Sequence, residues 1–379
     1  MKKIGILTFQ SADNYGAVLQ CFAMQEYLES IGYDVKVINY VPKYFEKKYS
    51  IYTPFFSTYW QYKKSQLKHC LLHAIKSYGR NIKLLTKYKK RKNFNKFRKN
   101  YFNITDKCVS YNEFLNMSLN FDIISVGSDQ VWSKRIMGGK YDPVFMLQGV
   151  DKKVKKMSYA ASCGGIFHKD DFKVLKNILS DYNFLSAREK SLAEQISTIS
   201  GKECYHVCDP VFLLSKEQWV EKLSICKSLS EKKYILAYNV SSEATSSEYF
   251  NLVDKMAKEI DCEIYEIGSC RRTKGKGKLF DNIGPVEFIQ MIIDSEFVFT
   301  TSFHATALSL IFEKQFNVFL PNSAERIISI LEKMNLMNKL VIPGGSYNLE
   351  NIKYDEIAKL RNEFIMDSVK YLNMYLINN

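Results

Sequence analysis

The chain has 379 residues, of which 46% are hydrophobic and 25% charged, and its formal net charge is +14. These proportions are ordinary for a globular protein and exclude disorder as the dominant state, while the length favours two domains over one. Nine cysteines without a Cys-x-x-Cys pair argue against a disulfide framework. No run approaches the roughly 18 apolar residues of a membrane helix. We therefore expect a cytoplasmic protein with reduced thiols.

The first 40 residues predict a β-α-β unit. Ile4–Phe9 is an apolar run that is too short for a signal peptide and leads into a polar loop, which favours a buried strand. Apolar residues then recur at helical spacing from Val18 to Ile31, Gly32 provides a helix stop, and Val35–Tyr40 is typical of a second strand. Two strands joined by a helix imply a parallel sheet.

Residues 43–100 form a basic insert that interrupts this pattern. The segment carries 17 Lys or Arg residues and one acid, Glu46, whereas the charges elsewhere nearly balance. Its first part is rich in aromatic residues, and 83–99 is typical of a lysine-dense helix. A charge excess in one segment indicates a local docking surface, and this composition favours peripheral attachment to an anionic membrane at its inner face. The alternative is a solvated, charge-rich excursion.

Strands and helices alternate again after the insert, in two series. Strands of the first series are expected at Phe121–Val126, Met157–Ala161, Phe184–Ser186 and Tyr205–Val207, and a second series runs from Tyr234 to Leu320. We therefore expect an α/β, GT-B-like architecture, in which two Rossmann-like domains face each other across a ligand-binding cleft. The expected units are a first domain at 1–214 containing the insert 43–100, a linker at 215–233, a second domain at 234–350, and a C-terminal helix at 351–379 that packs back on the first domain.

Polar residues gather directly after the predicted strands, where this architecture places its ligands. They are Asn14, Ser128, Asp129, Arg188, Glu189, Asp209 and His304. A loop that leaves a strand and opens a helix presents free backbone N–H groups and the positive end of a helix dipole, which suits an anion. Taken singly, Asn14 could cap a helix, Asp209 could set a turn and Arg188 could form a surface ion pair. Together, at five strand ends, they favour a binding site.

His304 is the most informative of these residues. Apolar residues flank it, so we expect it to begin a buried helix, and Thr300, Thr301 and Ser302 precede it with hydroxyl groups suited to a helix N-terminus. It could be a core histidine with satisfied hydrogen bonds. Its place at a helix start also suits a general acid or an anion ligand.

Two further groups of residues could bind a ligand. His69 and His73 have a spacing that would place both on one helix face, but no third ligand is evident in the sequence, so no metal is expected. The run 271–278 is either a solvated loop or a phosphate clamp that closes over the cleft, and its basic residues are Arg271, Arg272, Lys274, Lys276 and Lys278.

A set of short motifs runs through the chain in a fixed order. They are Ile4–Phe9, Asn14–Gln20, Val126–Trp132, Ser186–Glu189, Cys208–Val211 and Thr300–Thr306. In this order they resemble the motifs of the polysaccharide pyruvyl transferase family, over nearly the whole chain outside the insert. The resemblance implies a GT-B-like fold and transfer of a pyruvyl group from phosphoenolpyruvate to a sugar diol, giving a pyruvate ketal and phosphate. The implied acceptor is a lipid-diphosphate-linked precursor of a surface polysaccharide, such as capsule or exopolysaccharide.

The resemblance also implies which residues contact the donor. Arg188 matches the arginine of the family's Arg-Glu motif, and His304 matches the histidine of its Arg-x-His motif. Ser302 stands where many members have the arginine of that second motif, so this donor contact is missing or relocated to the basic loop. We expect the donor to be bound by Arg188, Asn14, Ser128, Ser302, Arg271, Arg272 and Lys278.

The chemistry of this donor suits the residues independently of the family. Phosphoenolpyruvate carries a carboxylate and a phosphate, which call for guanidinium groups, lysines and backbone N–H donors. Protonation of its methylene carbon needs a general acid, for which His304 is the candidate. The sugar hydroxyl needs a base or orienting carboxylate, for which we choose Asp129, with Asp209 as the alternative. No metal, no cofactor other than phosphoenolpyruvate as co-substrate, and no nucleic acid partner are expected.

Two other functions fit parts of the sequence. A GT-B nucleotide-sugar glycosyltransferase of capsule or exopolysaccharide synthesis would share the two-domain architecture, but it would not release phosphate from phosphoenolpyruvate. A non-catalytic module that binds polyanions or membranes through the insert would leave the motifs outside the insert unexplained.

Overall fold

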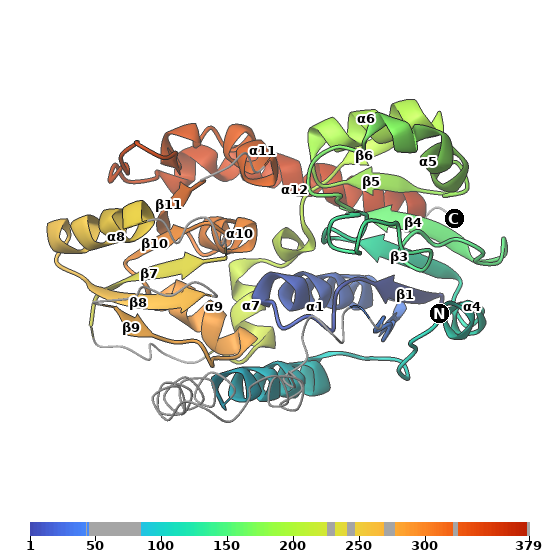
Figure 1. Ribbon diagram of the computed structural model, residues 1–379, viewed down its shortest axis with the longest axis horizontal. Helices are drawn as coiled ribbons and strands as arrows, with labels where there is room; N and C mark the ends of the chain where they lie inside the picture. The colour runs from blue at the N-terminus through green and yellow to red at the C-terminus, as the bar shows by residue number, and fades with distance from the viewer. Residues whose placement is uncertain are drawn as a thin grey trace, which may run out of the picture.

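A computed structural model of the chain describes residues 1–42, 44, 85–225, 232–240, 247–268, 277–320 and 325–376. Two parallel sheets lie side by side along the long axis of the molecule, with helices packed around each (Figure 1). The alternation of strands and helices predicted from the sequence is confirmed in both halves.

The first sheet has the strand order β2-β1-β3-β4. Single bridges from Met157 to Phe184 and from Ala161 to Ala187 connect β4 to the separate pair β5-β6. The strands are β1 (Lys3–Leu7), β2 (Asp34–Val37), β3 (Ile123–Gly127), β4 (Lys155–Tyr159), β5 (Leu185–Ala187) and β6 (Cys204–His206). β3 is buried along its whole length, as expected for a central strand of a covered parallel sheet. The helices of this half are α1 (Tyr15–Ser30), α4 (Tyr111–Ser118), α5 (Phe172–Leu179) and α6 (Lys190–Ser200).

The second sheet has the strand order β12-β11-β10-β7-β8-β9. Its strands are β7 (Tyr234–Asn239), β8 (Glu263–Gly268), β9 (Lys278–Leu279), β10 (Phe297–Thr300), β11 (Gln315–Phe319) and β12 (Leu340–Val341). β7 and β10 lie at its centre and are buried throughout. The surrounding helices are α8 (Ser247–Glu259), α9 (Pro285–Asp294), α10 (Phe303–Ile311) and α11 (Glu325–Lys333).

Elements that follow β6 join the two halves. They are the 3₁₀ helix η3 (Pro210–Leu213), α7 (Lys216–Lys222) and the long helix α12 (Tyr354–Leu376). α12 runs from the second half to the first (Figure 1), where the hydroxyl of Tyr371 donates to the carbonyl of Ser158 at 2.9 Å. The backbone N–H of Cys208 donates to Ser368 Oγ on the same helix at 2.8 Å.

One hydrophobic core extends across both halves. On α1 of the first half, Tyr15 stacks on Phe288 of α9 with ring centroids 4.3 Å apart. Further along α1, Phe22 contacts Trp219 of α7 at 5.5 Å. All four side chains belong to a single cluster of buried residues that also includes Leu372 of α12. The space between the two sheets is therefore filled by side chains around a small polar site.

Apart from Tyr44, the described part of the basic insert is a helix at residues 85–101. Arg98 donates from Nε to the carbonyl of Gln10 at 2.8 Å and from Nη2 to the carbonyl of Ala12 at 2.6 Å. Asn93 donates to the carbonyl of Asn282 in the second half at 2.6 Å, so the helix contacts both halves. Most of the insert, including His69 and His73, lies outside the described residues. Across the described ranges, no helix is long and apolar enough to span a membrane.

Candidate active site

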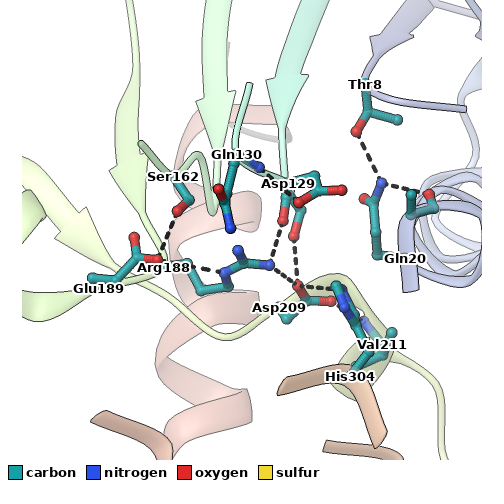
Figure 2. Close-up of polar contacts among 12 residues, drawn as sticks. Thr8, Gln20, Asp129, Gln130, Ser162, Arg188, Glu189, Asp209, Val211 and His304 are labelled. Carbon is teal, nitrogen blue, oxygen red and sulfur yellow. Dashed lines mark hydrogen bonds and ion pairs between the residues drawn. The ribbon is translucent and has the colours of Figure 1, made fainter. Parts of the chain in front are cut away.

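Arg188 is the centre of a buried polar cluster at the carboxyl ends of the first-half strands. It follows β5 directly, and only 3% of its surface is exposed. Its Nη1 atom donates to the carbonyl of Ser128 at 2.6 Å and to the Asp209 carboxylate at 2.7 Å (Figure 2). Ser128 follows β3 and Asp209 caps η3 after β6, so three strand ends meet at one guanidinium.

Asp209 is held by several groups at once. Its Oδ1 accepts from the backbone N–H of Val211 at 3.1 Å, which fixes the turn into η3. Its Oδ2 accepts from Arg188 and from Ser128 Oγ, the latter at 2.9 Å, and lies 3.5 Å from His304 Nε2. Burial alone would raise the pKa of Asp209, but His304 and Arg188 lower it to about 2. A carboxylate with this pKa is a weak base, so its geometry suits orienting Arg188 and His304.

His304 reaches this cluster from the second half. It lies in the first turn of α10, whose N-cap Ser302 accepts from the backbone N–H of Ala305 at 3.4 Å. The imidazole packs against the start of α1, because a Cβ placed on Gly16 would lie 2.0 Å from His304 Nδ1. Its Nε2 atom is buried and has no hydrogen-bond partner among the described residues. The imidazole therefore lies between the two halves, beside the carboxylate of Asp209.

One edge of the Arg188 guanidinium is buried but unbonded. In the described parts of the chain, neither Nε nor Nη2 has a hydrogen-bond partner. Glu189 Oε1 is 3.8 Å from Nε, which is too far for a hydrogen bond, and the ring of Phe303 covers the guanidinium at 4.7 Å. Burial opposes its charge, but Asp209, Glu189 and Asp129 outweigh burial and raise the pKa of Arg188. A permanently charged fork with two free donors matches a carboxylate or a phosphate oxygen pair.

Arg326 is a second arginine at the site, and the sequence motifs do not include it. It lies in the first turn of α11, and burial lowers its pKa, as does the charge of Arg188. With the Gln130 amide oriented so that its oxygen faces the guanidinium, Arg326 Nη2 and Nη1 donate to that oxygen at 2.8 and 3.0 Å. Because this helix is the next one after β11, its first turn is a further strand-end position, and this is the signal by which Arg326 could have been found in the sequence.

The two arginines line a cavity of about 10 Å³, together with Asp209, Phe303 and His206. A volume of this size holds about one water molecule. Burial, together with the charges of Lys333 and Lys190, lowers the pKa of His206 to about 4. This side chain is therefore neutral near pH 7, and the cavity's positive charge comes from the arginines.

The remaining predicted site residues lie in several places. Asn14 caps α1 by accepting from the backbone N–H of Ala17 at 3.2 Å, and its role in donor binding stays a prediction. Asp129 is half-buried beside Ser128 and accepts from the N–H of Gln130 at 2.7 Å. Lys278 lies on the edge strand β9, over the ring of Tyr265 at 5.4 Å, away from the Arg188 cluster. Arg271 and Arg272 lie outside the described residues.

The structure thus brings Ser128, Asp129, Arg188, Asp209 and His304 to one site. Within the described ranges, no group of three His, Cys, Asp or Glu side chains could hold a metal ion.

Comparison with known proteins places this site in a family. The sequence model of the polysaccharide pyruvyl transferase family matches residues 14–323. The chain belongs to this family. The match spans nearly the whole chain and includes the Arg188, Asp209 and His304 motifs. The predicted family is therefore confirmed, and with it a pyruvyl transferase enzyme that acts on polysaccharide.

Solved structures confirm the GT-B-like fold of this pyruvyl transferase. The UDP-GlcNAc 2-epimerase of Neisseria meningitidis, bound to UDP-GlcNAc, is 10% identical and covers 100% of both chains with a TM-score of 0.50. A Listeria monocytogenes protein assigned as a UDP-N-acetylglucosamine 2-epimerase is also 10% identical, with a TM-score of 0.50, over 98% of this chain and 88% of its own. At this identity the likeness concerns the fold alone. No curated protein sequence matches the chain.

Proposed function

We propose that the protein transfers the pyruvyl group of phosphoenolpyruvate to two hydroxyls of a sugar in a lipid-diphosphate-linked polysaccharide precursor, forming a pyruvate ketal and phosphate. The observation that carries this proposal is the free Nε and Nη2 edge of Arg188, buried beside His304. Buried N–H groups without partners cost about 1–3 kcal/mol each, and an anion that accepts from both would remove that cost.

The donor needs more than one cation. Phosphoenolpyruvate carries a carboxylate and a phosphate, and Arg188 has one free edge for one of these groups. Arg326 supplies a second guanidinium at the same cavity, and in our proposal it replaces the arginine expected where Ser302 stands. The cavity holds about one water molecule and is too small for phosphoenolpyruvate. Donor binding therefore requires Arg326 to break its hydrogen bonds with Gln130 and to bind the donor in its place. Arg271 and Arg272 remain predicted donor contacts.

The proposed reaction forms one C–H bond and two C–O bonds and breaks the C–O bond to phosphate, and proton exchange with solvent afterwards restores His304 and Asp129. His304 donates a proton to the methylene carbon, which becomes a methyl group and leaves an oxocarbenium-like centre. The first sugar hydroxyl attacks this centre and loses its proton to Asp129. The second hydroxyl then forms the other C–O bond as the bond to phosphate breaks, and its proton leaves with the phosphate. Asp209 stabilises the protonated imidazole before transfer, since its carboxylate lies 3.5 Å from Nε2.

The first prediction tests this assignment directly. The protein should release phosphate from phosphoenolpyruvate in the presence of a lipid-diphosphate-linked oligosaccharide, and mass analysis should show the glycan as its pyruvate ketal. His304→Gln should lower turnover by about 10²–10⁴, the usual contribution of a general acid. Arg188→Lys should mainly raise the KM for the donor, because a lysine cannot present two parallel donors.

His168→Gln is the matched control, since this side chain is 76% exposed and pairs with Asp170. Near-native turnover in both site variants would contradict the assigned site. Sugar transfer from a nucleotide sugar, with no phosphate released from phosphoenolpyruvate, would contradict the proposed reaction.

A further inference from the structure

Glu189 is a buried carboxyl group that the proposed reaction leaves without a role. It precedes α6, and only 1% of its surface is exposed. Its Oε1 accepts from Ser162 Oγ at 2.7 Å (Figure 2). Its Oε2 is also buried and finds no hydrogen-bond partner in the portion of the chain that the structure describes. A buried carboxylate oxygen without a donor is costly, which marks this atom as part of a site that awaits a partner.

The carboxyl lies beside the free edge of Arg188. Oε1 is 3.8 Å from Arg188 Nε, one of the two unbonded atoms of that edge. Any anion that accepts from Nε and Nη2 must therefore lie next to the carboxyl of Glu189. Two neighbouring negative groups in a buried site repel each other strongly, and protonation of the carboxyl removes the repulsion.

The pKa of Glu189 is already higher than that of an exposed glutamate. Burial raises its pKa in spite of the opposing charges of Arg188 and Arg326 and the hydrogen bond from Ser162. Other titratable groups at this site are Asp129 and Asp209, which also interact with Arg188, and Cys163 on the loop after β4, whose pKa burial raises to about 12. An arriving anion would reduce the opposing effect of both arginines. The pKa of Glu189 should then rise further.

We propose that Glu189 takes up a proton as the anionic donor binds and, as a neutral acid, donates a hydrogen bond from Oε2 to that donor. Glu189 is thus a donor-binding residue whose charge changes with occupancy. The inference rests on the proposed function, because it takes phosphoenolpyruvate as the anion. It predicts that donor affinity falls as the pH rises, by about tenfold per pH unit between the pKa of Glu189 in the free protein and that in the complex.

Calorimetric titration with phosphoenolpyruvate tests the proton directly. Titrations of the full chain at about pH 8, in buffers of different ionisation enthalpy, count the protons taken up on binding. At this pH the phosphate of the donor, whose second pKa is about 6, is already ionised and contributes little. The unaltered protein should take up about one proton more per donor bound than Glu189→Gln. That variant keeps the shape and a hydrogen-bond donor, so it should bind with an affinity that changes little with pH.

Two further variants make the result specific. Glu194→Gln changes an exposed glutamate on α6 and should keep the proton uptake. His304→Gln should keep the proton uptake as well, which excludes His304 as the group that takes up the proton. If Glu189→Gln does not fold, this variant is the remaining test, because loss of the uptake in His304→Gln would contradict the inference. Donor binding with equal proton uptake in the unaltered protein and Glu189→Gln would overturn this inference and leave the proposed function standing. Absence of donor binding in the unaltered protein would overturn the proposed function, and this inference with it.

Discussion

Gly16 determines where the His304 imidazole can lie. A Cβ at this position would lie 2.0 Å from Nδ1 and 2.3 Å from Cγ of His304. Real non-bonded carbon atoms do not approach so closely, so the imidazole occupies the space that a side chain would fill. The absence of a Cβ at this position of α1 is what lets the His304 imidazole from α10 lie against the first half.

We therefore expect Gly16→Ala to displace the imidazole and lower turnover by about 10²–10⁴, as much as removing the acid does. Overpacking of this kind typically costs about 1–3 kcal/mol of stability. The stability cost should be measured by urea unfolding, alone and in the His304→Ala background. Because the clash is with the ring, the cost should largely disappear in the double variant. An equal cost in both backgrounds would show that the alanine strains α1 itself.

The sequence predicts which residues lie at the site better than it predicts the hydrogen bonds between them. Ser128 follows β3 of the first sheet, and Arg188 and Asp209 follow β5 and β6 of the parallel pair that is bridged to it, so parallel strand geometry is enough to bring them together. Strand-end geometry predicts Arg326 only if the helix that begins after β11 is recognised in the sequence. Its contact with Gln130 depends on how the two halves pack, which local patterns do not reveal.

Among the elements, the helix at 85–101 has two unlike faces. Phe94 and Phe97 are buried against the core, and Arg98 and Arg91 pair with Asp13 on the loop that leads to α1. The opposite face exposes four lysines, Lys89, Lys92, Lys96 and Lys99, and residues 85–101 contain no acid. Exposed Leu85 and Tyr88 lie near the start of the helix. This face supports the proposed peripheral contact with an anionic membrane.

We expect the protein to co-sediment with vesicles that contain anionic lipid, and to detach as salt is added. Each engaged lysine contributes about 1 kcal/mol at most, so changing Lys89, Lys92 and Lys96 to Gln should weaken binding by up to about two orders of magnitude. In the matched control, Gln replaces three exposed lysines around α5, which are Lys169, Lys173 and Lys176. This triple variant should change binding little. Equal losses in the two triple variants would indicate a response to net charge. Full recovery in the supernatant at low salt would contradict membrane contact.

Element boundaries could be read from the sequence where a buried apolar run follows an amphipathic helix. The two-residue strands β9 and β12 could not, because so few residues carry no periodic pattern. A lysine-dense helix in the insert was predicted, but its orientation was not. Its partners, Asp13 and Asn282, lie far apart in the sequence, and only the packed structure brings them to one helix.

On the scale of the whole molecule, the continuous core predicts that the two halves unfold together. Phe288 of α9 stacks on Tyr15 of α1 and contacts Tyr238 of β7 at 4.9 Å. Phe288→Ala should cost about 3–5 kcal/mol, the usual range for a buried aromatic side chain. Hydrogen exchange should show an equal loss of protection at slowly exchanging amides of β3 and of β10. Loss confined to β10 would show that the halves unfold independently.

The path of α12 has a consequence for synthesis on the ribosome. This helix follows both sheets in the sequence, yet its buried residues Tyr371, Leu372 and Leu376 belong to the core that contains β1 and α1. The first half is therefore translated first but completed last, and the nascent chain exposes the apolar surface that α12 later covers. Molecular chaperones that bind exposed apolar segments have a defined target in this interval, which lasts until the second half has left the exit tunnel.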